Sequence, residues 1–301
     1  MSTQLKAKTS PMPASAPVGA TRLAATVRDI AALPTACLRV VQVANDPAAS
    51  AGDIAEVVSC DPALTARALR LVNSAAYALP ERVSTLSGAV RVLGTDGLRD
   101  LALASGAIGA LDKLTSPLID MDEFWRTSVH CALVGRELGT ISRHAHPEQC
   151  FLAGLLHDVG ALAIASREPE HWLEVQRRAT QAVATRAGIE LEVFGFTRAD
   201  VGAELLRAWR LPEALVEPVR YLERPAAAGD YIGDAAILNI ARTLSSCEVA
   251  GAEGVAASPP AITWKLAGLA EHVAAEVLDL ADARWFEVLE ILAPGGVQLR
   301  Y

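Results

Sequence analysis

The chain has 301 residues, of which 51% are hydrophobic and only 5% aromatic. A chain of this length and composition can bury a large core of aliphatic side chains, as helical proteins do. The formal net charge of −8 argues against nucleic acid and anionic membranes as partners, because both attract clustered Lys and Arg. The five cysteines (Cys37, Cys60, Cys131, Cys150 and Cys247) have no CxxC spacing, so we expect reduced thiols in the cytoplasm.

The first 20 residues combine Pro, Ser, Ala and Lys without a periodic apolar face. They predict a disordered tail and not a signal peptide, whose central region would be continuously apolar. No later run approaches the roughly 20 uncharged apolar residues of a membrane-spanning helix. The sequence therefore predicts a soluble, cytoplasmic protein without a membrane partner.

From Thr21 onward, helical patterns follow one another and no segment alternates like a strand, so the predicted fold class is all-α. Asp61 is the expected N-cap of a helix that begins at Pro62. Asn73 and Ser74 follow the last apolar residues of that helix. Two interpretations of this pair are open, a helix end with its turn or a polar contact between lobes. The first is favoured because these residue types favour turns.

Gly94 ends the next predicted helix, and Thr95 begins another. Residues 112–122 form a polar connection that contains proline, so we place a boundary between two helical lobes near residue 120. The predicted organisation is a tail (1–20), an N-terminal lobe (21–120) and a second lobe with a C-terminal helical extension (121–301). Because the connection is short, the two lobes should share one core.

The second lobe is expected to be helical throughout, with helices at 124–139, 147–160, 169–188, 199–210, 212–223 and 231–245 and a pair within 262–292. The five tryptophans of this lobe are expected in the core and not on a surface where nucleic-acid bases stack: Trp125, Trp172, Trp209, Trp264 and Trp285.

The most chemically concentrated stretch is FLAGLLHDVG at residues 151–160. Pro147 is expected in the first turn of its helix and Gly160 at its end. The apolar residues with helical spacing are Leu152, Leu155, Leu156 and Val159. They turn His157 and Asp158 toward whatever packs beside that face. A His–Asp pair can ligate a metal or be inert, and the inert interpretation is favoured because a metal site needs three or more ligands.

Together with FWRTSVHCALVGRELG at 124–139, this stretch resembles the HD superfamily of metal-dependent phosphohydrolases. DPALTARALRLVNSAAY at 61–77, followed by LSGAVRVLG at 86–94, resembles the HDOD domain, a branch of that superfamily linked to bacterial signalling. The resemblance covers approximately residues 33–225 and keeps the motifs in the order of the family. It implies a two-lobed helical HDOD fold in which one lobe packs on the other.

The resemblance also implies where metal ligands would lie. In an HD site, histidines and aspartates from several helices hold one or two divalent metals that activate water. His157 and Asp158 match the HD pair, but Thr127, Arg198 and Asn239 stand where the family has other ligands. A guanidinium cannot ligate a metal and repels one. The resemblance thus leaves a degenerate site with no metal.

Other histidines and carboxylates offer replacements. His130 lies three residues after Thr127 and near the same helix face, where it can be a substitute ligand or a core histidine. The core interpretation is favoured. His144 and His146 form an HxH pair with no Cys or acidic cluster beside it, which favours a polar loop over a metal site. Asp234 is expected to be a carboxylate at a helix start.

The resemblance, together with the missing ligands, implies a non-catalytic regulatory module of bacterial signal transduction that binds signalling proteins and has no cofactor. The alternative is a metal-dependent phosphodiesterase or phosphohydrolase with a reduced ligand set, His130, His157, Asp158 and Asp234. A third interpretation is a module that binds a nucleotide without cleaving it, with Arg198 on a phosphate. The resemblance also implies an ion pair, because Arg198 stands where the family has a metal-facing histidine and would replace the metal beside Asp158.

Overall fold

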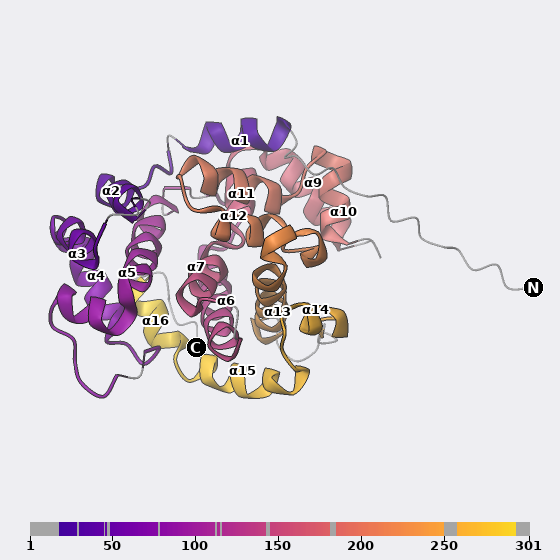
Figure 1. Cartoon of the computed structure of the whole chain (residues 1–301). Helices are drawn as coiled ribbons and strands as arrows, with labels where there is room; N and C mark the ends of the chain where they lie inside the picture. Colours follow the sequence, from indigo (N-terminus) through magenta and orange to yellow (C-terminus); the bar gives the residue numbers. More distant parts are fainter. Residues whose placement is uncertain are drawn as a thin grey trace, which may run out of the picture.

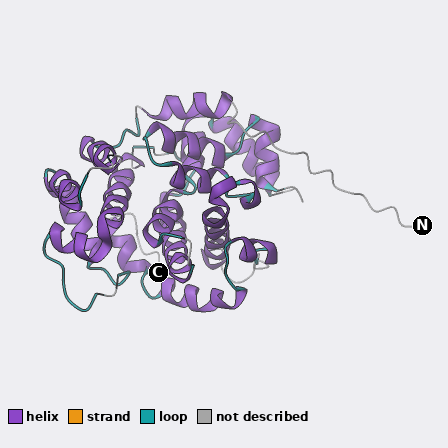
Figure 2. Ribbon diagram, in the orientation of Figure 1, coloured by secondary structure: helices purple, strands orange, loops and turns teal. Residues whose placement is uncertain are grey.

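The computed structural model describes residues 18–28, 30–44, 46, 49–77, 79–111, 113–114, 116–142, 145–180, 185–249 and 258–292. Helices form the regular structure of these residues and no strand occurs among them (Figure 2), which confirms the all-α class. The first 17 residues of the predicted tail lie outside the described residues, as does His144.

The first helices are α1 (Val18–Arg28), α2 (Thr35–Ala44), α3 (Ala51–Ser59), α4 (Pro62–Val72) and α5 (Leu86–Leu111). The central ones are α6 (Met121–Ile141), α7 (Pro147–Leu156), α8 (Val159–Arg167), α9 (Pro169–Ala179), α10 (Arg186–Phe194), α11 (Arg198–Ala208) and α12 (Glu213–Arg220). The last are α13 (Ile232–Val249), α14 (Ala261–Leu266), α15 (Ala274–Asp282) and α16 (Trp285–Leu292). Short 3₁₀ turns at Pro225–Ala227, Gly229–Tyr231 and Glu271–Val273 complete the described elements.

Two lobes are visible in Figure 1, α2 to α5 in the first and most later helices in the second. The predicted boundary at residue 21 does not hold for α1, which packs on α8 and α11 of the second lobe. Its attachment is specific, because Trp209 Nε1 donates to the carbonyl of Ala31 at 2.7 Å. Residues 18–20 of the predicted tail form the first turn of this helix. The C-terminal extension also crosses between lobes, since α16 packs on both α4 and α6.

The ends of α4 follow the sequence prediction. The carboxylate of Asp61 accepts two backbone N–H bonds of the first turn at 3.0 Å, and Pro62 is the first helical residue. Asn73 ends the helix, and its side-chain amide bonds both backbone groups of Val83 at 2.7 Å. Ser74 donates to a carbonyl of the preceding turn. The pair therefore closes a helix end inside the first lobe, as the favoured interpretation had it.

Between the lobes, α5 ends at Leu111 as the sequence indicates, whereas α6 begins at Met121, three residues before the expected start of that helix. Gly94 interrupts α5 with φ 72°, a conformation that glycine adopts without strain. Asp120 is the N-cap of α6, and its carboxylate accepts the N–H groups of Asp122 and Glu123. Buried apolar residues of both lobes belong to one continuous core. The expected shared core is therefore present.

Three polar side chains cross between the lobes, and we call Tyr77, Arg136 and Glu148 the lobe junction. The Tyr77 hydroxyl donates to Glu148 Oε2 at 2.5 Å, and Arg136 Nε donates to Glu148 Oε1 at 3.1 Å. The Arg136 guanidinium also lies 4.2 Å from the Tyr77 ring centroid. One carboxylate thus joins the loop after α4 to α6 and α7.

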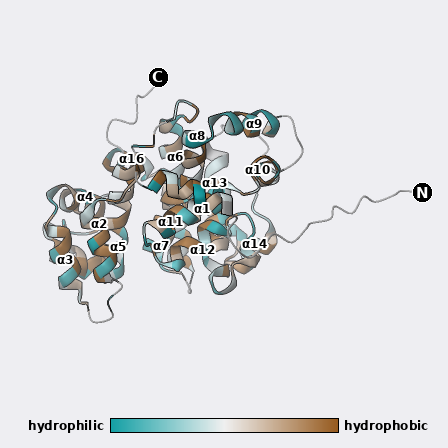
Figure 3. Ribbon diagram, turned by 90° about the horizontal axis from the view of Figure 1, so that it is seen from above, coloured by the Kyte–Doolittle hydropathy of each residue, from teal (hydrophilic) through white to brown (hydrophobic). Residues whose placement is uncertain are grey.

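Two predicted helices of the second lobe are divided in the structure. Residues 147–160 form α7 and the start of α8, with a turn at His157 and Asp158. Residues 169–188 contain all of α9 and the first turn of α10. α9 is mostly hydrophilic, as its teal colour in Figure 3 shows.

One apolar segment was underestimated from the sequence. The described residues include one segment, Pro147–Arg167, whose length and composition would allow a membrane span. In the structure this segment comprises α7 and α8, and 83% of its apolar window is buried inside the molecule. A helix pair covered in this way on most sides is a core element of the second lobe.

Candidate functional site

Two glycines fix the turn that carries His157 and Asp158. A Cβ at Gly154 would lie 2.7 Å from the Ala132 Cα, so α7 approaches the backbone of α6 closely. A Cβ at Gly160 would lie only 1.9 Å from the carbonyl oxygen of Arg198, so α8 touches the start of α11. Gly160 is therefore not a helix end, as the sequence suggested, but a backbone contact. That contact brings Arg198 to the HD pair.

His157 is a buried, neutral imidazole. Only 4% of its surface is exposed, and Nδ1 lies 2.7 Å from the Gly154 carbonyl. A carbonyl oxygen can only accept, so Nδ1 carries the proton and Nε2 keeps a lone pair. Burial lowers the pKa of His157 below its ordinary value, despite the adjacent Asp158. The ring is consequently held in one tautomer.

Asp158 occupies the N-cap position of α8 but makes no side-chain cap bond. Both carboxylate oxygens instead lie 3.3 Å from Nη1 of Arg198. The ion pair predicted from the sequence is therefore present. The Arg198 side chain is 15% exposed and that of Asp158 29%, so water screens this contact only partly.

Arg198 has a second and closer carboxylate partner that the sequence analysis missed. Glu190 accepts from Arg198 Nε at 2.6 Å and from the Arg198 backbone N–H at 2.9 Å. Its side chain is only 1% exposed. Burial by itself would lower the pKa of Arg198, but Asp158 and Glu190 outweigh it and raise that pKa. No local pattern in the sequence indicates Glu190, because its place beside Arg198 is set by the packing of α10.

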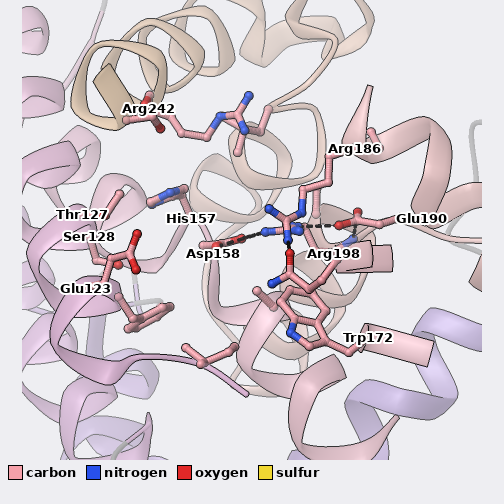
Figure 4. A pocket seen from close by; sticks show the side chains of 18 of the residues that line it. Glu123, Thr127, Ser128, His157, Asp158, Trp172, Arg186, Glu190, Arg198 and Arg242 are labelled. Atoms are coloured by element: carbon pink, nitrogen blue, oxygen red, sulfur yellow. Dashed lines mark hydrogen bonds and ion pairs between the residues drawn. The ribbon is translucent and has the colours of Figure 1, made fainter. Parts of the chain in front are cut away.

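Arg198 and the HD pair line a cavity of about 370 Å³ between α6, the α7–α8 turn, α9, α10, α11, the turn after α12 and α13. Figure 4 shows Thr127 on one wall of this cavity and Trp172 on another. The Trp172 ring is 2% exposed, as expected for a core tryptophan. It also carries the Arg198 guanidinium 5.0 Å from its centroid, and that of Arg186 at 5.5 Å.

Two predicted site residues do not line the cavity. His130 is buried, as the favoured interpretation expected, and its ring nitrogens lie 2.9 Å from Ser245 Oγ and 2.9 Å from Asp282 Oδ1. Asn239 donates from its side chain to the carbonyl of Leu222 at 2.8 Å. Both residues join α13 to its neighbours and lie apart from the HD pair.

The reduced ligand set is not assembled. Asp234 lies beside Cys150 in a separate pocket, and both nitrogens of His130 are engaged elsewhere. Within the described ranges, no three His, Cys, Asp or Glu side chains are grouped so that they could hold a metal ion. At the HD pair itself, a divalent cation would lie beside the Arg198 guanidinium, which repels it. These residues do not fit a divalent metal.

Comparison with known proteins agrees with this architecture. The sequence matches the HDOD domain over residues 30–225, and the chain belongs to the HDOD family. A Shewanella amazonensis structure, provisionally named a phosphohydrolase, is 28% identical with a TM-score of 0.72, covering 90% of this chain and 98% of that one. A Marinobacter aquaeolei structure, provisionally named a signal transduction protein, is 26% identical with a TM-score of 0.67, covering 88% and 60%.

A curated relative extends beyond this chain. An uncharacterised Treponema pallidum protein is 26% identical over 217 residues, which is 70% of this chain but only 42% of the relative. The chain therefore spans less than half the length of that relative. The names phosphohydrolase and signal transduction protein belong to the Shewanella amazonensis and Marinobacter aquaeolei structures. They do not assign a function to the cavity of this chain.

Proposed function

We propose that this HDOD protein is a non-catalytic regulatory module of bacterial signal transduction that works in the cytoplasm by binding other signalling proteins. The observation that carries this proposal is the guanidinium of Arg198 against both Asp158 and Glu190. In catalytic HD proteins divalent metals neutralise such carboxylates and activate water. Here an arginine supplies the positive charge, and an arginine cannot polarise a bound water as a metal does.

The competing function is a metal-dependent phosphohydrolase. Retention of His157 and Asp158 favours it, as does the name of the Shewanella amazonensis neighbour. It requires that a metal displace Arg198 from Asp158 and recruit further ligands from solvent or substrate. A metal would have to break the ion pairs of Arg198 with Glu190 and Asp158. This argues against the phosphohydrolase function, because breaking a buried ion pair costs about 3 to 5 kcal/mol.

Elemental analysis and hydrolysis assays separate the two functions. We expect protein purified without chelator to contain less than stoichiometric iron, manganese or zinc. It should not hydrolyse bis(p-nitrophenyl) phosphate or cyclic dinucleotides, with or without added manganese. A His157→Ala variant serves as the control, because a contaminating enzyme would be equally active in both preparations. Stoichiometric metal, with hydrolysis that disappears in His157→Ala, would overturn the proposal.

A further inference from the structure

One arginine of the cavity has no carboxylate partner. Arg186 begins α10 and donates to the side-chain amide of Gln176. Across the described part of the chain, no Asp or Glu forms an ion pair with it, whereas Arg198 and Arg242 each have one or more. Partial burial and the positive charge of Arg198 lower the pKa of Arg186, although Asp158 and Glu190 act in the opposite direction. This exposed cation therefore lies beside Arg198 and makes no direct ion pair of its own, although Asp158 and Glu190 are close enough to act on it.

The other two arginines keep unused donors in the same cavity. Arg198 Nη2 and Arg242 Nε are buried and have no hydrogen-bond partner. Figure 4 shows the guanidinium groups of Arg186 and Arg198 near each other, with Arg242 across the cavity. A buried donor without a partner costs free energy, and a ligand that offers an acceptor oxygen removes this cost. Three guanidinium groups around one space match a phosphate, whose oxygens accept several charge-assisted bonds.

The opposite side of the cavity is acidic. Of the five carboxylates on its walls, Asp158 and Glu190 bind Arg198, and Glu223 binds Arg242 at 3.0 Å. The remaining two, Asp120 and Glu123, lie at the start of α6. A carboxylate can accept hydrogen bonds from the hydroxyl groups of a ligand. The ligand is thus expected to be anionic at one end and to carry hydroxyl groups at the other.

We propose that this cavity binds a nucleoside monophosphate and retains it uncleaved. Its phosphate lies among Arg186, Arg198 and Arg242, and its ribose hydroxyls reach Glu123. The volume of about 370 Å³ falls within the range of small-ligand pockets and exceeds the need of a lone phosphate. The assignment rests on the proposed non-catalytic function, because a metal at Asp158 would reorganise the same arginines.

Isothermal titration calorimetry of the full chain tests this assignment with five probes: AMP, GMP, ribose 5-phosphate, inorganic phosphate and adenosine. We expect a nucleoside monophosphate to bind most tightly, inorganic phosphate weakly and adenosine not at all. Arg186→Gln should weaken nucleotide binding by about 10- to 100-fold, because a charge-assisted contact is lost. The matched control is Arg177→Gln on exposed α9, which removes the same charge outside the cavity and should bind as the wild type.

Several outcomes would overturn the nucleotide assignment. They are absence of binding by every phosphate probe, equal affinity for AMP and adenosine, equal affinity for inorganic phosphate and the nucleotides, or undiminished binding by Arg186→Gln. In each case a metal-free, inactive protein leaves the proposed regulatory function standing. Conversely, release of phosphate from AMP in a His157-dependent reaction would refute the non-catalytic function even where binding is observed.

Discussion

Near each end of α7, an arginine from another helix binds a carboxylate and lies on an aromatic ring. At the N-terminal end Arg136 binds Glu148 and lies 4.2 Å from the Tyr77 centroid. Just beyond the C-terminal end, Arg198 binds Asp158 and lies 5.0 Å from the ring of Trp172. The residue types are nearly the same, yet the two clusters differ in how completely their donors are used.

At the lobe junction, Arg136 donates to Glu148 and to the carbonyl of Ala76 at 2.6 Å. Among the described residues, no buried side-chain nitrogen or oxygen of the junction lacks a partner. In the cavity, Arg198 Nη2 and Trp172 Nε1 are buried without one. A complete network stabilises one arrangement of the lobes, whereas an incomplete one leaves donors for a ligand. The difference suggests a structural joint at one end of α7 and a binding site at the other.

The largest effect is expected from Arg198→Ala. This change leaves Asp158 without a counter-ion and Glu190 buried at 1% exposure. An uncompensated buried charge costs about 3 to 5 kcal/mol, so urea denaturation should show a loss of that size in the free energy of unfolding. The partial exposure of Asp158 places the result toward the lower end of the range.

A variant that removes all three charges checks the cause. Replacing Arg198 with Met, Asp158 with Asn and Glu190 with Gln removes the cation together with its partners, so it should cost much less than Arg198→Ala alone. An Arg198→Ala protein as stable as the wild type would mean that the carboxylates do not depend on the guanidinium. The cavity end of α7 would then be no ion-paired cluster at all.

The second-largest effect is a pH dependence of the free energy of unfolding, and it concerns the lobe-junction side of the molecule. Asp100 on α5 is 3% exposed, and burial raises its pKa from 3.8 to about 6 despite its bond to Arg99. The folded state therefore binds this proton more tightly than the unfolded state, and stability falls as pH rises from about 4 to 6. Asp100→Asn removes this dependence. Its stability relative to the wild type should improve by about 3 kcal/mol between pH 4 and pH 7.

The matched control for that measurement is Asp96→Asn. Asp96 binds the same Arg99 at 2.8 Å, but its side chain is 70% exposed. Its removal should change the free energy of unfolding little at any pH. If the free energies of unfolding of Asp100→Asn and the wild type changed in parallel with pH, burial would not raise the pKa of Asp100.

Local chemistry made part of this molecule predictable. The cap at Asp61 and the interruption at Gly94 each depend on a few neighbouring residues, and both are present. The position of Arg198 opposite Asp158 came from the family resemblance, which carries tertiary information that spacing lacks. In each case, the positions of the residues in the sequence are enough to identify the interaction.

The rest depends on which helix packs against which. The apolar pattern continues through Asp158 into α8, so it does not reveal the turn that the contact of Gly160 with α11 imposes. An apolar face on α1 indicates burial but not that its partners are α8 and α11. Glu190 and Arg186 reach the cavity from α10, whose position is set by tertiary packing. These two residues of the site therefore had no local signal in the sequence.

The smallest of the three effects is expected from Tyr77→Phe. Burial raises the pKa of Tyr77 well above its ordinary value, so the hydroxyl stays protonated and remains a donor to Glu148. Removing a hydrogen bond to a charged group should cost about 2 kcal/mol in urea denaturation. Glu148 keeps its bond to Arg136, which is why the loss should be smaller than for Arg198→Ala.

Tyr221→Phe provides the control, since the Tyr221 hydroxyl makes no hydrogen bond to any residue that the structure describes, and its ring only faces Arg224. It should unfold like the wild type, while Tyr77→Phe should not bind nucleotide differently, because the junction lies outside the cavity. If both tyrosine variants were equally stable, the junction would not be the more complete network. The contrast between a joint at Glu148 and a ligand site at Asp158 would then rest on the cavity alone.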